Sequence, residues 1–424
     1  MDGRPRQQVI IPVTGSIDIK PVEAIINHPL HRKSYFRKQL GLAHVEYPGA
    51  QHMRAEHELG SYELAHRRAQ RWFEAGMISK EDAIALRVLG LIHDDPHGPY
   101  SHITDPLVTN DHNERAAPII EQMADAISQA GADPERIIKL MARKDPLAQG
   151  VLHTPLGVEK IDYLARDSYH SGIAGMLDVG PFLEYVYFDG EKIVADVMIQ
   201  QLVTSLVNHY WTMYDQCYYV QAVVIVERFM QRMISMLLGQ YGGEAEISED
   251  ELIGMVDSEL DVRLEFAKNP TVSADYQRYL NGEVPTVAIL LQLDPHQKAN
   301  WTPQQTVAHL PAGEEVFAER MRNPQLLSRL EAEIEKLVGL PGYSVLATPA
   351  APKRRFQPPE IFFQTNGGVI HFRDLNPIEW SAALAKARAH ARFYIATERK
   401  HQKKVSDPLT AQAIVEIITR YAEG

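Results

Sequence analysis

Apolar residues recur at intervals of three and four along most of the stretch from residue 20 to residue 240. This spacing places them on one face of a helix, so it predicts amphipathic helices, and strand signals are few there. The predicted helices cover residues 29 to 40, 55 to 75, 80 to 94, 113 to 130, 134 to 143 and 155 to 171, with one long helix or two joined helices over 197 to 239.

Two segments instead have the pattern of a β-hairpin. Asp189-Gly190 lies between alternating apolar residues in YVYFDGEKIVADV, and Asn366-Gly367 lies within IFFQTNGGVIHF. Asp-Gly and Asn-Gly are strong signals for two-residue turns between strands. We therefore expect a short hairpin at each place.

The amino-acid composition of the chain changes near residue 240. The sequence GQYGGEAEISEDE is polar and contains several glycines, which is typical of a domain boundary. Beyond it, further helices are predicted at about 314 to 338, 376 to 400 and 408 to 422. The expected fold is mostly α, with a helical core at 1 to 240 and a smaller mixed α+β lobe at 241 to 424 that carries short hairpins and is available for subunit contacts.

Composition and charge exclude several classes of protein. With 43 Lys+Arg against 55 Asp+Glu the net charge is −12, so no global positive field favours nucleic acid or an anionic membrane. Cys217 is the single cysteine and cannot form an internal disulfide. The first residues lack the apolar run of a signal peptide, and no apolar stretch reaches the ~18 residues of a membrane span. We expect a cytoplasmic protein in which local basic groups or a metal hold any phosphate.

Histidines and carboxylates concentrate between residues 57 and 114, most densely in HDDPHGPYSH at 93 to 102. Pro96 disfavours helix at the residue before it, so His93 and Asp94 are expected on the last turn of a helix. A histidine on one helix, this His-Asp pair on the next and a carboxylate about 65 residues later can meet if three helices pack together. Imidazole and carboxylate groups suit a divalent metal. Spacing alone leaves a metal site and a polar helix terminus about equally open.

Three segments carry a resemblance to a known family: YPGAQHMRAEHELGSYELA (47 to 65), LIHDDPHGPYSH (91 to 102) and EKIDYLARDSYHSGI (159 to 173). In order and spacing they resemble the deoxynucleoside triphosphate triphosphohydrolases of the HD superfamily, over about residues 17 to 173. The resemblance implies an HD-type helical bundle and hydrolysis of a dNTP to the deoxynucleoside and inorganic triphosphate. It also implies a divalent metal ion (Mn, Mg, Fe or Zn), a homo-oligomer (dimer or tetramer) and, as in some relatives, a nucleotide activator bound between subunits.

The resemblance also assigns roles residue by residue. The implied metal ligands are His57, His93, Asp94 and Glu159. The implied catalytic and phosphate-binding histidines are His97, His102 and His112, and Asp105 matches the acid that orients His102. The triphosphate would be held by Arg54, Lys160 and Tyr163, and the sugar 3′-hydroxyl would be read by Gln39 and Asp167. Helical spacing independently places Lys160, Tyr163 and Asp167 on one helix face, and Glu159 shares that side.

The chain also departs from the family pattern. Asp95-Pro96 stands where the family has Ile or Leu followed by Gly, which puts an extra acid and a rigid backbone beside the metal. Glu159 replaces the usual Asp, and His112 is followed by Asn113 where the family has Glu. These changes keep open an HD phosphohydrolase that acts on another nucleotide or phosphoester. A non-catalytic nucleotide-binding or sensing protein is the second alternative, and the full set of ligand residues counts against it.

Overall fold

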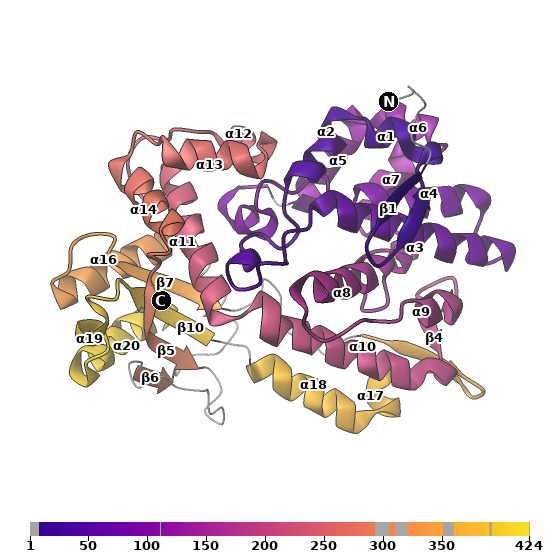
Figure 1. The fold of residues 1–424 in the computed structure, drawn as a ribbon. Coiled ribbons are helices and arrows are strands. Elements are labelled where there is room, and N and C mark those ends of the chain that lie inside the picture. The colour runs from indigo at the N-terminus through magenta and orange to yellow at the C-terminus, as the bar shows by residue number, and fades with distance from the viewer. Residues whose placement is uncertain are drawn as a thin grey trace. The chain divides into compact units, whose positions relative to one another are not determined.

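The computed structural model describes residues 8–110, 112–292, 306–309, 321, 323–350, 360–389 and 392–423. The chain divides into two compact units (Figure 1). Unit 1 contains residues 1–217, 253–258 and 359–380, and unit 2 contains residues 218–252, 259–358 and 381–424. The domains predicted at 1 to 240 and 241 to 424 stay a prediction. Within the described ranges, we find no helix with both the length and the apolar character that crossing a membrane requires.

Unit 1 is built around the helices α3 (Arg54–Glu74), α4 (Lys80–Ile92) and α8 (Val158–Ser171). Ser79 caps α4, because its side chain accepts a hydrogen bond from the backbone N–H of Asp82. Helix α4 packs closely on α3 at Gly90, which lies against Ser61. The other helices wholly within unit 1 are α1 (Glu23–Ile26), α2 (Pro29–Arg32), α5 (His112–Gln122), α6 (Ala124–Gln129), α7 (Pro134–Met141), α9 (Gly180–Glu184), α10 (Gln200–Met213) and α17 (Phe372–Leu375).

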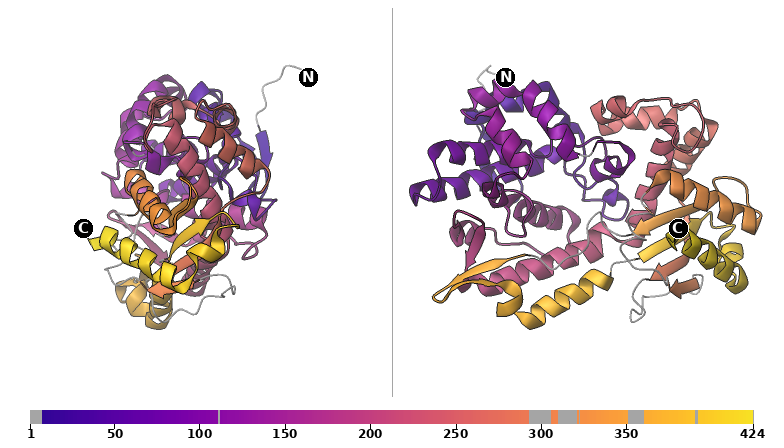
Figure 2. Two further views of the ribbon diagram at one scale, coloured as in Figure 1. Left: turned by 90° about the vertical axis from the view of Figure 1, so that its left-hand side faces the viewer. Right: turned by 180° about the vertical axis from the view of Figure 1, so that it is seen from behind.

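Both predicted hairpins form, and they join one four-stranded sheet of unit 1. The first consists of β3 (Val186–Phe188) and β4 (Ile193–Asp196), and the second of β8 (Phe362–Thr365) and β9 (Gly368–His371). The strand order is β3-β4-β8-β9, with β4 and β8 parallel. The second hairpin can be followed by its orange colour in Figures 1 and 2. A small antiparallel pair, β1 (Gln8–Ile11) with β2 (Gly15–Asp18), was not predicted.

The segment 253–258, which belongs to unit 1, supports two loops near the His- and Asp-rich motifs. The carboxylate of Asp257 accepts hydrogen bonds from the backbone N–H groups of Lys38 (2.8 Å) and Tyr100 (2.7 Å). The guanidinium of Arg37 donates to the backbone carbonyls of Met255 and Ile253. These contacts fix the ends of two loops that the sequence pattern could not place.

Unit 2 contains a sheet that the sequence did not predict. Its strands are β5 (Thr286–Gln292), β6 (Thr306–His309), β7 (Val345–Ala350) and β10 (Arg392–Thr397), in the order β6-β5-β10-β7. An apolar core joins this sheet to α16 (Pro324–Val338) and α20 (Pro408–Glu423). The other helices of unit 2 are α11 (Gln221–Leu237), α14 (Pro270–Leu280) and α19 (Gln402–Val405); α12 (Glu249–Gly254), α13 (Asp257–Glu265) and α18 (Pro377–Ala389) have residues in both units.

Four predicted helices differ from the structure over the described residues. The helix at 376 to 400 ends at Ala389, and residues 392–397 form the buried central strand β10, whose apolar run is compatible with either element. The helix at 29 to 40 is α2 followed by a 3-10 turn, and Arg37 is already extended. The segment at 113 to 130 is split at Met123. The predicted helix at 314 to 338 begins at Pro324, and residues 314 to 320 of that prediction lie outside the described residues.

Candidate functional site

Three of the predicted ligands meet where α3 passes the end of α4. His57 lies on α3, while His93 caps the C-terminus of α4 and Asp94 follows it. One ligand atom from each lies within 4.8 Å of the others, and all three residues are buried. The Nε2 atoms of His57 and His93 are 3.2 Å apart, and the Asp94 carboxylate lies 3.6 to 3.8 Å from them. This group is called the first cluster below.

Hydrogen bonds at the far side of each imidazole fix how the two rings face each other. Nδ1 of His57 lies 2.8 Å from Oδ2 of Asp162, and Nδ1 of His93 lies 3.0 Å from the carbonyl of Gly90. An acceptor at Nδ1 selects the tautomer that carries its proton there, which leaves Nε2 with a free lone pair. Both lone pairs then point into the first cluster, and a divalent cation is the group that such a donor set fits.

The two histidines differ in pKa because only one has a carboxylate behind it. Burial lowers the pKa of His93 to about 4, although the charge of Asp94 opposes this. Burial also acts to lower the pKa of His57, but the hydrogen bond to Asp162 and the nearby carboxylates outweigh it and raise that pKa above its usual value. Asp162 is itself held by Arg166, whose Nη2 donates to Oδ1 at 2.8 Å. Asp162 therefore positions His57 and adds basicity to it.

Asp94 connects the first cluster to a line of alternating charges. It forms an ion pair with the guanidinium of Arg54 and lies 3.5 Å from Nε2 of His97. Burial would raise the pKa of Asp94, but Arg54 and the histidines lower it well below its usual value. Nδ1 of His97 lies 2.8 Å from Asp105, and Asp105 in turn accepts a hydrogen bond from Arg115 at 2.7 Å. Against burial, the charge of Asp105 raises the pKa of His97.

Asp105 contacts His97, a partner that was not predicted for it. The predicted dyad of His102 with Asp105 stays a prediction, and His102 is exposed. The left-handed backbone at Tyr100 and Ser101 shapes the loop that leads to His102. His112 is the first residue of α5, and its side chain lies outside the described residues.

The predicted fourth ligand, Glu159, stands in the first turn of α8. Its carboxylate is not part of the group whose ligand atoms lie within 4.8 Å of one another. It is near enough for its charge to raise the pKa of His57, and burial raises its own pKa, although Lys160 and His57 oppose this. Its role as a ligand stays a prediction.

The other predicted substrate residues lie on α8 and in the loop before α3. Lys160 Nζ is 4.9 Å from the centre of the Tyr210 ring, and Tyr163 packs edge-on against His57 with ring centres 6.3 Å apart. Asp167 lies 2.9 Å from Nε2 of His52, and the backbone of Gln39 donates to the carbonyl of His52. Among the residues predicted for the site, Arg54 and His97 both contact Asp94. Gln39 and Asp167 both contact His52.

Sequence reasoning overlooked His52, Asp162 and Arg166. All three lie inside the segments quoted for the family resemblance, but each was treated as a spacer between assigned residues. The spacing of Asp162 and Arg166, four residues apart on a helix, was the available signal for an ion pair.

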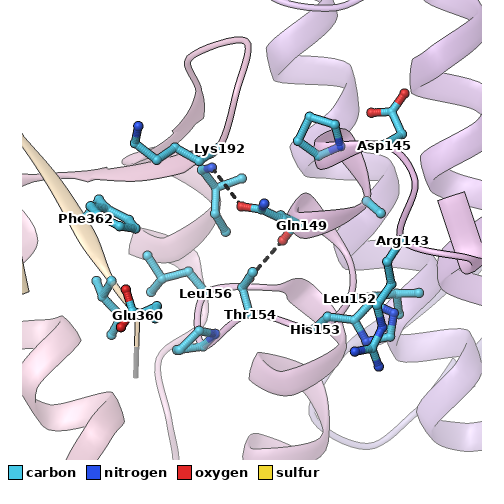
Figure 3. Close-up of a pocket in the computed structure, with 15 residues that line it drawn as sticks. Arg143, Asp145, Gln149, Leu152, His153, Thr154, Leu156, Lys192, Glu360 and Phe362 are labelled. Carbon is cyan, nitrogen blue, oxygen red and sulfur yellow. Dashed lines mark hydrogen bonds between the residues drawn. The ribbon is translucent and has the colours of Figure 1, made fainter. Parts of the chain in front are cut away.

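A cavity of about 480 Å³ lies elsewhere in unit 1 (Figure 3). Gln149 is one of the lining residues. Its side-chain oxygen accepts a hydrogen bond from the backbone N–H of Ile193, and its backbone carbonyl accepts one from the hydroxyl of Thr154. Arg143, His153 and Lys192 supply the nitrogens around it. The residues that line this cavity include none of those assigned to the site from the sequence, so the cavity is distinct from the first cluster.

Asp162→Asn is expected to weaken Mn²⁺ binding to the first cluster by about 10- to 100-fold, because the amide lacks the charge that makes His57 more basic. Isothermal titration of the metal-free protein with Mn²⁺ measures this. The control is Asp125→Asn, the same change on the exposed face of α6. Equal affinities in the two variants would show that Asp162 serves the fold alone.

Comparisons with known proteins show what the chain as a whole is similar to. No family model matches the chain. The chain is 28% identical over 218 residues to the deoxynucleoside triphosphate triphosphohydrolase SAMHD1 of Bos taurus, which covers 41% of this chain and 37% of that protein. It is 29% identical over 224 residues to an uncharacterized protein of Methanocaldococcus jannaschii, covering 51% and 46%. The chain therefore matches less than half the length of these relatives.

Solved structures extend the likeness of fold beyond the motifs. A phosphohydrolase of Bacteroides thetaiotaomicron superposes with a TM-score of 0.71 at 19% identity, over 93% of this chain and 100% of that one. A hypothetical protein of Aquifex aeolicus superposes with a TM-score of 0.70 at 19% identity, over 95% and 99%. The fold that surrounds the first cluster is therefore found in other proteins over almost its whole length.

Proposed function

We propose that this chain, which resembles the deoxynucleoside triphosphate triphosphohydrolases of the HD superfamily, is a metal-dependent phosphohydrolase that cleaves a dNTP to the deoxynucleoside and inorganic triphosphate. The observation that carries the proposal is the first cluster, in which two imidazole Nε2 atoms and the Asp94 carboxylate converge in a buried position. The likeness to SAMHD1 supports the choice of substrate class.

The donor set of the first cluster fits a divalent metal. Nitrogen and carboxylate oxygen together suit Mn²⁺, Fe²⁺, Zn²⁺ or Mg²⁺, and the Nδ1 contacts hold both rings in the ligating tautomer. His57, His93 and Asp94 would hold the ion, with Glu159 proposed as the fourth ligand. A bound ion of this kind lowers the pKa of a water molecule and neutralises phosphate charge.

The remaining groups handle charge and protons. Arg54 forms an ion pair with Asp94, and its guanidinium would neutralise negative charge on a substrate phosphate bound beside the ion. His97 is paired with Asp105, which keeps its imidazole protonated to a higher pH, as a general acid for the leaving 5′-oxygen requires. Lys160 and Tyr163 would hold the outer phosphates, and His102 and His112 are proposed to assist them.

A second candidate function is the hydrolysis of another nucleotide or phosphoester at the same metal site. The observation that favours it is Glu159, which takes the place of the shorter carboxylate and is not part of the group whose ligand atoms all lie within 4.8 Å of one another. A longer side chain there would change where an ion and a substrate bind. Nucleotide binding without turnover is the remaining alternative.

End-product analysis separates these candidates. Metal-free protein is supplied with Mn²⁺, Fe²⁺ or Mg²⁺ and with each dNTP, with and without GTP as activator, beside a panel of nucleoside monophosphates and cyclic nucleotides. Release of inorganic triphosphate is the expected result. Phosphate or pyrophosphate from a different substrate would replace the proposed reaction with the second candidate, and binding without any product would contradict both.

A further inference from the structure

A second group of potential metal ligands lies beside the first cluster in unit 1. It consists of His31 on α2, Glu58 on α3 and Asp95 after the end of α4, and it is called the second cluster below. One ligand atom from each lies within 4.8 Å of the others. Glu58 and Asp95 directly follow the first-cluster residues His57 and Asp94. Because successive side chains on a helix point about 100° apart, Glu58 and His57 point to different sides of α3.

The second cluster is sealed from solvent. The side chains of His31 and Glu58 are 0% exposed and that of Asp95 is 1% exposed. Nδ1 of His31 lies 3.0 Å from Oδ1 of Asp95 and 3.7 Å from Oε2 of Glu58. The three side chains therefore face one another across a short distance.

Much of the bonding capacity of these side chains is unused among the described residues. Both carboxylate oxygens of Glu58, Oδ2 of Asp95 and Nε2 of His31 are buried without a hydrogen bond of normal geometry there, although the Ser34 hydroxyl is close enough to act to lower the pKa of Glu58. An ionised carboxylate buried without a partner costs several kcal/mol, so native proteins seldom keep one without a counter-charge. Arg37 is close enough for its charge to interact with both acids, but its guanidinium donates hydrogen bonds to the backbone carbonyls of Met255, His97 and Ile253.

We propose that His31, Glu58 and Asp95 form a second divalent-cation site in this protein, separate from the first cluster. One imidazole nitrogen and the oxygens of two carboxylates suit a hard or borderline ion, of which Mn²⁺ is the example used for the test. A dication balances the charge of the two carboxylates and occupies the oxygens that lack partners. Asp95, an acid at the position where the family has an apolar residue, would then be a metal ligand.

Protons are the competing occupant. Burial lowers the pKa of His31, but Asp95 and Glu58 outweigh it and raise that pKa to about 9, while burial and the neighbouring carboxylates raise the pKa of Glu58 to about 8. A protonated His31 paired with Asp95, beside a neutral Glu58, would be an electrically balanced cluster without metal. The two states differ in the number of metal ions bound per chain.

Metal counting on the full chain distinguishes the two states. The purified protein is stripped with a chelator, reloaded with Mn²⁺ and desalted, and bound metal is measured by mass spectrometry of the native protein. Two ions per chain are expected for the wild type. Glu58→Gln and Asp95→Asn are each expected to bind one, as is Asp94→Asn, whereas Asp125→Asn binds two. One ion in the wild type, unchanged by Glu58→Gln, would overturn the proposal.

Anomalous diffraction from Mn²⁺-loaded wild-type crystals tests the same point without any variant. A peak among His31, Glu58 and Asp95 is the expected result, and density for a metal at the first cluster alone overturns the proposal. A peak at the second cluster alone would support this site while contradicting the metal-dependent function proposed above. The two proposals can therefore fail separately.

Discussion

Replacing Asp94 by asparagine is expected to reduce turnover of the substrate by about 10³-fold or more, with Mn²⁺ binding at the first cluster lost. The carboxylate of Asp94 lies within ion-pair distance of four side chains: Arg54, His57, His93 and His97. The variant would therefore disturb the proposed metal ligands, the proposed phosphate-binding Arg54 and the proposed acid His97 together. A bound divalent ion stabilises the charge of the transition state by several kcal/mol, and this stabilisation is lost when the ion no longer binds. Since about 1.4 kcal/mol corresponds to a factor of ten in rate, the expected loss follows.

The measurement is kcat on the best substrate found by end-product analysis, with Asp125→Asn as the matched control. Circular dichroism and gel filtration verify that the variant is folded. Activity within tenfold of the wild type would mean that Asp94 is not a metal ligand, and the proposed reaction would then lack its centre.

Gly90→Ala is expected to destabilise the protein by about 1 to 3 kcal/mol. A Cβ at this position would lie 2.8 Å from the backbone oxygen of Ser61 and 2.9 Å from Cβ of Ala65, so α3 and α4 would have to separate. Helix propensity alone favours alanine over glycine by about 1 kcal/mol. The contact outweighs that gain because the atom struck is backbone and cannot rotate away.

The urea concentration at the unfolding midpoint measures this change. Gly342→Ala is the control, because the position is exposed and a Cβ there meets nothing within 4 Å. The helices forced apart by Gly90→Ala carry His57 and His93, so we also expect weaker Mn²⁺ binding at the first cluster. A midpoint raised above that of the wild type would contradict the close helix approach.

The first cluster could be predicted because its residues lie on long helices with strong periodicity. His57 and His93 are set by the 3.6-residue repeat of α3 and α4, and Pro96 marks the end of the second helix. The contact of Asp105 with His97 was not predicted, because it depends on loop backbone such as the positive φ of Tyr100, which no periodic pattern encodes.

The sheet of unit 2 shows the other limit of sequence reasoning. Its central strand β10 pairs with β5, which ends 100 residues earlier at Gln292, and with β7. Such pairings depend on tertiary contacts, and the run of Phe393, Tyr394 and Ile395 is as apolar as the interior of a helix. The second cluster was overlooked for a related reason, since His31 lies in a short helix far from the quoted motifs.

The parallel pairing of β4 with β8 determines when unit 1 can be completed during synthesis. Ala195 pairs with Phe363, so the edge of β4 has no partner strand until the later hairpin has left the ribosome. An unpaired strand edge is a template for association with other chains. A fragment that stopped at residue 240 would keep every residue of the first cluster and still expose this edge, so we expect such a fragment to aggregate.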